Sequence, residues 1–327
     1  MAVRNLKDIK RIAVLTSGGD CAGMNACIRS IVRTAVSKGL EVIGFLRGYI
    51  GLVNNEFIKL NHRSVSGIIN LGGTILKTGR CKEFYNKEAR EMAIKNLKKN
   101  QIDGLIVIGG NGSFKGANLL FKEFGINIIG VPATIDNDIW GTDLSIGADT
   151  AVNVALDAID KIRDTATSLE RIFVIEVMGR DCGYIALQTA LAGGCEDVLI
   201  PEKDFDIVKM CEEITEGAIR GKISWIIIVA EGKAKASEIA NKITQITGLE
   251  TRVCVLGHIQ RGGRPTATDR ILASRLGAKS VELLLEGKTN LAVGIKNNKL
   301  TTVSLEEAIK PKPLEVDSYY KLIKILT

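Results

Sequence analysis

Short, largely apolar segments alternate with longer amphipathic segments along nearly the whole chain. The apolar segments lie at residues 11–15, 41–45, 103–108, 126–131, 171–177, 197–200, 224–229 and 251–256. Apolar segments of this length predict buried parallel strands, and the amphipathic segments between them predict helices. Such an alternation predicts a doubly wound α/β protein. We further expect a loop at Arg47–Leu52 and a short helix at Val65–Asn70.

The chain has 327 residues, 46% of them hydrophobic, which suggests two domains or one domain with two lobes. No apolar run approaches the roughly 20 residues of a membrane span, and the polar stretch Met1–Lys10 lacks a signal-peptide core. The seven cysteines are scattered singly without a CxxC pair, which indicates reduced thiols in a cytoplasm and argues against a disulfide framework or a zinc site.

The net charge of +7 is spread along the chain without a basic block. Because no aromatic residues are interleaved with basic ones, a nucleic-acid-binding protein is a weak interpretation. A basic enzyme that acts on phosphorylated substrates explains the charge equally well.

Two predicted strands end in glycine-rich turns that lead directly into helices. The first turn is Thr16–Asp20, followed by Gly23–Asn25, and the second is Gly109–Ser113. A strand, a glycine turn and a helix together point free backbone N–H groups at a phosphate. Neither turn is a Walker A loop, and the absence of GxGxxG argues against a Rossmann-type dehydrogenase. The first turn is equally compatible with a structural role, and the second is the better phosphate candidate because its helix starts at once.

A pair of carboxylates follows the predicted strand at 126–131, because Thr134–Asp138 contains Asp136 and Asp138. Ligands of open α/β sheets bind at the carboxyl ends of strands. One acid there could accept a proton from an attacking hydroxyl while the other handles a metal or the geometry. Taken alone, the pentapeptide is better described as a turn rich in Asp and Asn.

Charged residues follow several other predicted strands, namely Arg180, Glu231, His258 and Arg261. Together with the two acids they describe a cleft for an anionic, hydroxyl-rich ligand beside a nucleotide. Singly, each has a structural alternative: His258 could be an interior histidine, Met178 a core residue and Arg80 a surface charge.

Five motifs in this order resemble those of the bacterial-type ATP-dependent 6-phosphofructokinases, from Arg11 to about Lys299. They are Thr16–Asp20 with Gly23–Asn25, Gly109–Ser113, Pro132–Asp138, Glu176–Arg180 and Gly257–Gly263. The resemblance implies a phosphofructokinase-like fold, with two doubly wound lobes of mainly parallel sheets. Residues 1–146 with 259–309 would form an ATP-binding lobe, and residues 147–258 with 310–327 a fructose 6-phosphate-binding lobe.

The resemblance also implies a reaction of glycolysis, the Mg²⁺-dependent transfer of the ATP γ-phosphoryl group to O1 of fructose 6-phosphate. Asp136 would be the general base, flanked by Thr134 and Asp138, and Arg80 and Arg180 would lie near the transferring phosphate. The implied ATP contacts are Gly19, Arg80, Cys81, Gly110, Asn111, Gly112 and Ser113. The implied sugar-phosphate contacts are Thr134, Asp136, Asp138, Met178, Gly179, Arg180, Glu231, His258 and Arg261, with Arg171 and Arg252 inserted from a neighbouring subunit. The expected assembly is therefore a homotetramer with shared active sites.

Three positions bear on the metal and on the phosphoryl donor. Asn111 stands where the family has an aspartate that interacts with magnesium, and an amide brings no negative charge. Gly112 and Ala133 follow the ATP pattern, whereas pyrophosphate-using relatives tend to have Asp and Lys there. Lys77 and Lys82 add charge near the phosphate path, so use of pyrophosphate stays an alternative.

The family also has an effector site between subunits, which would make the enzyme allosteric. The residues that match its pattern are Arg29, Arg33, Arg163, Glu196, Arg220 and Lys222. Glu56, Asn61 and Ser224 depart from it, and Glu56 replaces an arginine. Because a carboxylate repels an anion, we do not expect control by phosphoenolpyruvate.

A second hypothesis is a catalytically weak, regulatory paralogue that binds nucleotide and sugar phosphate, and Asn111 is the residue that raises it. Under either hypothesis the expected ligands are ATP and fructose 6-phosphate. The expected location is cytoplasmic, with no nucleic-acid or membrane partner.

Overall fold

The computed structural model describes residues 9–327 and divides the chain into two compact units. The first unit comprises the described residues up to Asp149 together with Arg261–Lys312, and the second comprises Thr150–Gln260 with Pro313–Thr327. The divisions predicted from the sequence lie after residues 146, 258 and 309. Which ligand each unit binds stays a prediction.

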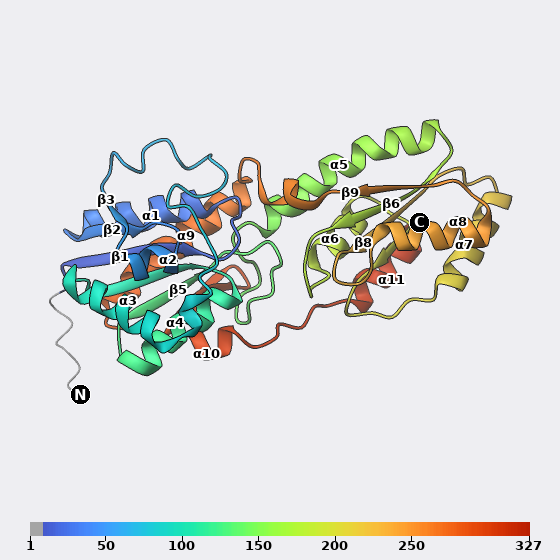
Figure 1. Ribbon diagram of the computed structural model, residues 1–327. Helices are drawn as coiled ribbons and strands as arrows, with labels where there is room; N and C mark the ends of the chain where they lie inside the picture. Colours follow the sequence, from blue (N-terminus) through green and yellow to red (C-terminus); the bar gives the residue numbers. More distant parts are fainter. Residues whose placement is uncertain (1–8) are drawn as a thin grey trace. The chain divides into compact units, whose positions relative to one another are not determined.

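The first unit contains a seven-stranded sheet in the order β11-β10-β5-β4-β1-β2-β3 (Figure 1). Its strands are β1 (Arg11–Ser17), β2 (Glu41–Phe45), β3 (Phe57–Leu60), β4 (Gly104–Gly109), β5 (Ile128–Pro132), β10 (Leu291–Lys296) and β11 (Lys299–Ser304). Only the pairs β2–β3 and β10–β11 are antiparallel within this sheet. The strand order reverses between β1 and β4, so their carboxyl ends form a topological switch point, where α/β proteins bind ligands.

Helices cover both faces of this sheet. Ala13 and Leu15 of β1 share one apolar core with Leu97 and Phe114. The helices of that core are α2 (Tyr49–Asn54), α3 (Lys87–Lys99), α4 (Asn111–Phe124) and α10 (Leu305–Ala308). On the other face, α1 (Met24–Ser37) packs against α9 (Ala267–Leu285) (Figure 1). The short 3₁₀ helix η2 (Glu83–Tyr85) precedes α3.

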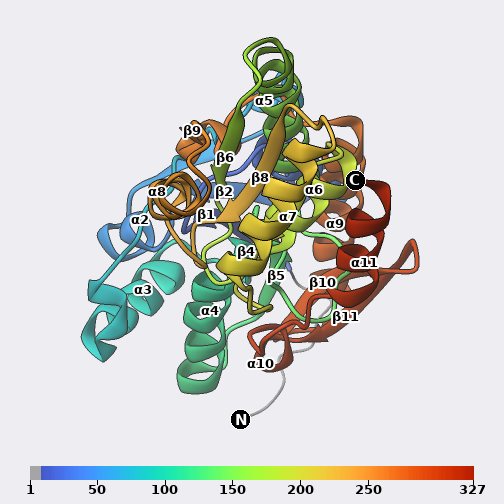
Figure 2. The same ribbon diagram turned by 90° about the vertical axis from the view of Figure 1, so that its right-hand side faces the viewer.

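The second unit contains a four-stranded parallel sheet in the order β7-β8-β6-β9. Its strands are β6 (Ile172–Val177), β7 (Asp197–Leu199), β8 (Trp225–Ala230) and β9 (Thr251–Val255). Its helices are α5 (Ala148–Ser168), α6 (Tyr184–Ala192), α7 (Ile207–Ile219), α8 (Ala236–Thr247) and α11 (Asp317–Leu326). Helices α7 and α8 pack on one face through Met210, Ile214 and Ile243, and Figure 2 shows α7 in front of β8. The 3₁₀ helix η3 (Gly257–Arg261) follows β9 and ends at the first residue that returns to the first unit.

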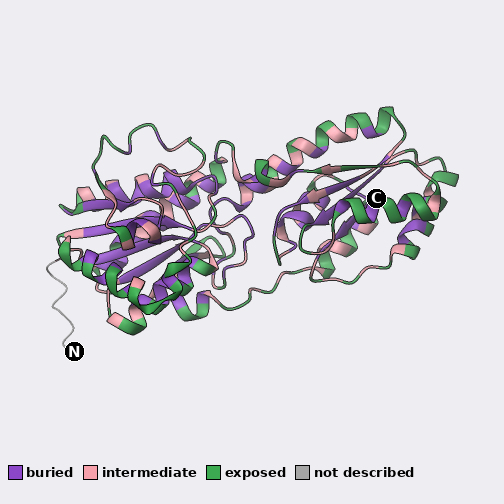
Figure 3. Cartoon of the chain, in the orientation of Figure 1, coloured by how far each residue is buried: buried purple, intermediate pink, exposed green. Residues whose placement is uncertain are grey.

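Buried residues concentrate in the strands of both units (Figure 3). The prediction of an α/β protein with mostly parallel sheets is confirmed. The predicted loop at Arg47–Leu52 is wrong, because Gly48 adopts φ 64° and helix α2 begins at Tyr49. The predicted helix at Val65–Asn70 is also wrong, because this stretch forms only turns.

Within the described residues, no helix is both long and apolar enough to cross a membrane. All seven cysteines are free thiols. Burial raises the pKa of the Cys21 and Cys27 thiols and raises that of Cys195 to about 12. These three thiols are therefore protonated and unreactive at neutral pH.

Candidate active site

The turn after β1 is braced by a segment distant in sequence. The Thr78 hydroxyl donates to the Gly18 carbonyl at 2.9 Å, and the Thr16 hydroxyl donates to the Lys77 carbonyl at 2.7 Å. Arg80 and Cys81 directly follow this segment, so the bracing brings them beside the turn. The Arg261 guanidinium donates to the Asp20 carbonyl at 3.0 Å, and a Cβ atom at residue 19 would lie 2.4 Å from it. Glycine at position 19 therefore leaves the space that Arg261 fills.

The turn after β4 is attached to the end of β1. The Ser113 hydroxyl donates to the Ser17 carbonyl at 2.9 Å, and a Cβ atom at Gly109 would lie 2.5 Å from that hydroxyl. Helix α4 starts at Asn111 without a side-chain cap. Because the first N–H groups of a helix have no partner within the helix, this N-terminus can bind a phosphate.

The turn after β5 is fixed by hydrogen bonds of its own. The Thr134 hydroxyl accepts the Asp136 N–H at 3.2 Å, and the Ser145 hydroxyl donates to the Thr134 carbonyl at 2.7 Å. Asn137 has φ 52°, and its side-chain oxygen accepts the Ser145 N–H at 2.9 Å. Asp136 is buried in this turn, with only 6% of the residue exposed.

Asn111 and Asp138 join the second turn to the third. The Asn111 amide donates to one Asp138 carboxylate oxygen at 2.6 Å. The Asn111 side-chain oxygen and the second Asp138 carboxylate oxygen, Oδ1, are both buried and have no hydrogen-bond partner. Buried oxygens without partners are costly, and magnesium prefers oxygen ligands. The pair therefore fits a contact to Mg²⁺, although the described residues contain no group of three or more His, Cys, Asp or Glu side chains that could hold a metal alone.

In the second unit, Glu231 organises the turn after β6. Its carboxylate accepts the N–H of Gly179 at 3.3 Å and that of Arg180 at 3.0 Å. Both residues have positive φ, 147° and 52°, and a Cβ atom at residue 232 would lie 1.7 Å from the Arg180 carbonyl. The carboxylate thus holds an unusual backbone and leaves the exposed Arg180 side chain at the carboxyl end of the sheet.

Met178 and His258 complete the predicted set at this end of the second unit. Met178 is 8% exposed, as predicted for a core residue, and its N–H donates to the Gln260 side chain at 3.3 Å. The interpretation of His258 as an interior histidine is wrong. His258 lies in η3 and is exposed.

Arg171 and Arg252 lie at the opposite, amino end of the same sheet. Arg171 immediately precedes β6. Arg252 lies on β9, opposite Phe173 of β6. Both guanidiniums contact Glu250: Arg171 at 2.9 Å through Nε, and Arg252 through a terminal nitrogen. In the second unit, strand β6 therefore separates these arginines from Met178–Arg180.

The predicted effector residues are divided between the units. Arg29 and Arg33 lie on α1, and the Arg33 Nε atom is buried without a hydrogen-bond partner. In the second unit, Arg163 donates to the Gly193 carbonyl at 2.5 Å, and Lys222 pairs with the buried Glu196 at 3.2 Å. The remaining predicted residue, Arg220, pairs with Glu216 on α7 at 3.0 Å.

Glu56 and Asn61, which depart from the family pattern, also contact neighbouring residues. Glu56 forms an ion pair with Arg47, so its charge is matched by a neighbouring cation within the first unit. The Asn61 side chain accepts the N–H groups of Arg63 and Ser64, at 2.9 and 3.1 Å.

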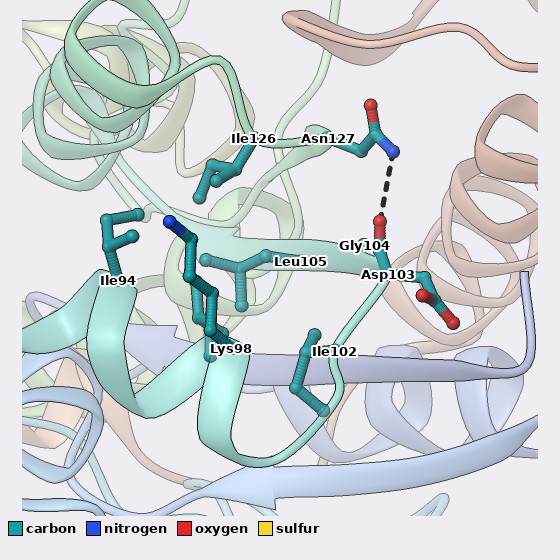
Figure 4. A pocket seen from close by; sticks show the side chains of 9 residues that line it. Ile94, Lys98, Ile102, Asp103, Gly104, Leu105, Ile126 and Asn127 are labelled. Atoms are coloured by element: carbon teal, nitrogen blue, oxygen red, sulfur yellow. Dashed lines mark hydrogen bonds between the residues drawn. The ribbon is translucent and has the colours of Figure 1, made fainter. Parts of the chain in front are cut away.

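A cavity of about 50 Å³ lies at the amino end of β4, far along the strand from the three turns (Figure 4). Ile94, Leu105 and Ile126 line it, and the Asn127 amide at its rim donates to the Asp103 carbonyl at 3.0 Å. A space of this size holds one or two water molecules. It is too small for a nucleotide or a sugar phosphate.

The three turns of the first unit leave strands that lie side by side in the order β5-β4-β1. The phosphofructokinase family model matches residues 11–284. The chain belongs to the phosphofructokinase family. A curated relative from Clostridium botulinum strain Hall, named ATP-dependent 6-phosphofructokinase, is 53% identical over 98% of this chain and 100% of its own.

Solved structures show the same fold. The phosphofructokinase of Saccharomyces cerevisiae has a TM-score of 0.87 at 37% identity over 92% of this chain. This chain spans 45% of the yeast chain. A pyrophosphate-dependent phosphofructokinase from Marinobacter aquaeolei has a TM-score of 0.83 at 26% identity, covering 97% of this chain and 91% of that one.

Sequence reasoning did not single out Tyr49, Arg90 or Glu250. The Tyr49 hydroxyl donates to the carbonyl of Ser113, the last residue of the second turn, at 2.6 Å. No motif marks these residues.

The contact between Asn111 and Asp138 makes a prediction for Asn111→Asp. The substitution places two carboxylates at hydrogen-bond distance, where they repel unless a proton or a cation lies between them. We expect the melting temperature without metal to fall and to recover more in Mg²⁺ than that of the unmodified protein. We also expect a lower apparent magnesium constant and a higher kcat/KM at low magnesium.

Asn118→Asp is the matched control, since Asn118 is a buried amide on the same helix with an unpartnered oxygen. Its melting temperature should fall without a specific response to Mg²⁺. Thermal unfolding against free Mg²⁺ measures both variants. Superimposable magnesium curves for the unmodified protein and Asn111→Asp would show that residue 111 plays no part in metal use.

Proposed function

We propose that this protein is an ATP-dependent 6-phosphofructokinase, which transfers the γ-phosphoryl group of ATP to O1 of fructose 6-phosphate. Membership of the family and the full-length similarity to the Clostridium relative support this activity. The observation that carries the proposal is the grouping of the three turns at the carboxyl ends of β1, β4 and β5, around the strand switch point.

The turns divide the chemical work. Backbone N–H groups at the start of α4 would hold the ATP phosphates, with Gly19, Arg80, Cys81 and Ser113 around them. The Asp136 carboxylate accepts the proton of the sugar O1 hydroxyl as O1 bonds to the γ-phosphorus and the bond from phosphorus to the bridging oxygen breaks, releasing ADP. Thr134 fixes the base through its hydrogen bond to the Asp136 N–H. Mg²⁺, contacted by the unpartnered oxygens of Asn111 and Asp138, would neutralise phosphate charge.

Fructose 6-phosphate would contact Met178–Arg180, Glu231, His258 and Arg261. Arg171 and Arg252 would contact the sugar phosphate of a neighbouring subunit. Within one chain, roughly 20 Å of strand lies between Arg171 and Met178, because each strand residue advances the chain by about 3.3 Å. The two arginines are therefore too far from Met178–Arg180 of their own chain to share one phosphate with them. That separation supports the proposal of a homo-oligomer with shared sites, in this family a tetramer.

The donor is ATP in this proposal because of the space at Gly112. A Cβ atom at Gly112 would meet no atom within 4 Å, so the glycine is not required by packing and leaves the approach to α4 open. A coupled assay of fructose 1,6-bisphosphate formation, with ATP and then pyrophosphate, should show turnover with ATP. Turnover with pyrophosphate alone would assign the other donor, and binding of both ligands without turnover would favour the catalytically weak paralogue.

The buried Asp136 gives the next prediction. Asp136→Ala should lower kcat by roughly 10²–10⁴ because no other group accepts the O1 proton. Calorimetry should give an ATP affinity close to that of the unmodified protein, since the turns at Gly19 and Ser113 are intact. A turnover number like that of the unmodified protein would exclude Asp136 as the base.

The positions of Arg171 and Arg252 predict complementation between subunits. Arg252→Ala should raise the KM for fructose 6-phosphate, because a guanidinium–phosphate pair is lost. If Asp136→Ala and Arg252→Ala chains are dissociated and reassembled together, some sites combine an intact Asp136 with an intact Arg252 from its neighbour. Activity above the sum of the separate variants is expected, and its absence would show that each chain builds its own site.

A further inference from the structure

A buried arginine connects α3, α4 and the segment that follows Arg80. The Arg90 side chain is 7% exposed. Its Nε and one terminal nitrogen donate to both carboxylate oxygens of Glu123, at 2.8 and 2.7 Å. Its other terminal nitrogen donates to the carbonyls of Phe84 and Tyr85, each at 2.8 Å. A bidentate pair of this kind fixes the relative orientation of the two side chains as well as the distance between them.

A second connection runs from the same segment to the start of α4. The Phe84 ring stacks on the Tyr49 ring with centroids 4.1 Å apart and planes 19° apart. The Tyr49 hydroxyl donates to the Ser113 carbonyl at 2.6 Å. Burial raises the pKa of that hydroxyl, so it remains a neutral donor. A Cβ atom at Gly116 would lie only 3.0 Å from the Tyr49 ring and 3.2 Å from the Phe84 ring, so both rings lie close against α4.

Phe84 in turn fixes Cys81, because its N–H donates to the Cys81 carbonyl at 3.3 Å. Residues 81–85 are thus held to both ends of α4: to its last turn through Arg90 and Glu123, and to its first turn through Tyr49 and Ser113. Arg80, by contrast, has an exposed side chain at the start of this segment. Its position relative to α4 depends on the anchored residues that follow it.

We propose that Arg90 and Tyr49 are positioning residues for the nucleotide, which hold the Arg80–Cys81 segment at a fixed place beside the phosphate-binding start of α4. The inference rests on the proposed function, because it takes the nucleotide to bind between these two segments. Neither side chain touches the ligand. Each acts through main-chain carbonyls, Arg90 through those of Phe84 and Tyr85, and Tyr49 through that of Ser113.

The test uses Tyr49→Phe and Arg90→Lys in the full chain, with MgATP and fructose 6-phosphate binding measured separately by calorimetry. Tyr49→Phe keeps the ring stack and removes one hydrogen bond, so the MgATP dissociation constant should rise about three- to tenfold. Arg90→Lys keeps the charge but loses the two-pronged contact, and the rise should be at least as large. Affinity for fructose 6-phosphate should change by less than about twofold in both variants, since the change is confined to the Arg80–Cys81 segment and the start of α4.

Lys122→Gln is the matched control. Lys122 lies next to Glu123 on α4 and forms an exposed ion pair with Glu306 at 2.9 Å, which should add little stability. Its MgATP affinity should equal that of the unmodified protein. Melting temperatures of all variants show whether each remains folded at the assay temperature, and Tyr49→Phe keeps the test valid if Arg90→Lys does not.

MgATP affinities within twofold of the unmodified value in Tyr49→Phe would overturn the inference. An equal loss of affinity for both ligands would also overturn it, because that result indicates general destabilisation. If the unmodified protein binds both ligands but transfers no phosphoryl group, the proposed function fails while the selective effect on MgATP still supports the positioning role.

Discussion

The parallel pairing of β1 with β4 is the constraint on which the candidate site depends. Ser17 and Gly109 are opposite each other at the last position of the two strands. Because the strands run in the same direction, their glycine turns open at the same edge of the sheet. The Ser113 hydroxyl then reaches the Ser17 carbonyl, and the space that it needs exists only because Gly109 has no side chain. Without this pairing, the turn after β1 would not lie beside the start of α4.

The amide at Asn111 changes what the third turn can do. A carboxylate at 2.6 Å from Asp138 would be repelled, whereas the amide nitrogen of Asn111 donates a hydrogen bond to it. The cost appears elsewhere, since Asn111 Oδ1 and Asp138 Oδ1 are left buried without partners. Each such oxygen costs about 1–3 kcal/mol. A cation contacted by both would recover this free energy, with one negative charge from the protein instead of two.

The sequence was sufficient for features that depend on local pattern. Apolar runs identified the strands that carry the turns, because buried parallel strands need uninterrupted apolar residues. It failed at α2, where Gly48 suggested a loop although Tyr49 and Leu52 are buried. It also failed to indicate β3, β10 and β11. Of these, β3 and β11 are partly exposed edge strands that lack a clear apolar run.

Long-range contacts were beyond sequence reasoning for a different reason. Arg90 meets Glu123 across 33 positions of sequence, and Tyr49 meets Ser113 across 64. Neither pair shares a motif, and an arginine within an amphipathic helix ordinarily indicates a solvent-exposed face. The interpretation of His258 as an interior histidine failed in the same way, because the exposure of His258 depends on the path of η3 and not on the residue type. The turns of the candidate site could be located from sequence, but the residues that support them could not.

In the second unit, Glu231 and Glu250 lie beside the predicted phosphate-binding arginines at opposite ends of one sheet. Glu231 holds the turn at the carboxyl end through backbone N–H groups, which leaves the Arg180 side chain available. Glu250 contacts two guanidiniums at the amino end, so the cluster keeps a net positive charge. Exposed pairs of this kind contribute little stability and can be exchanged for a phosphate. Since the strand between the two ends cannot shorten, the proposed sharing of one phosphate by both sets needs a second copy to supply one of them. Strand β9, which carries Arg252, is an edge strand of this sheet.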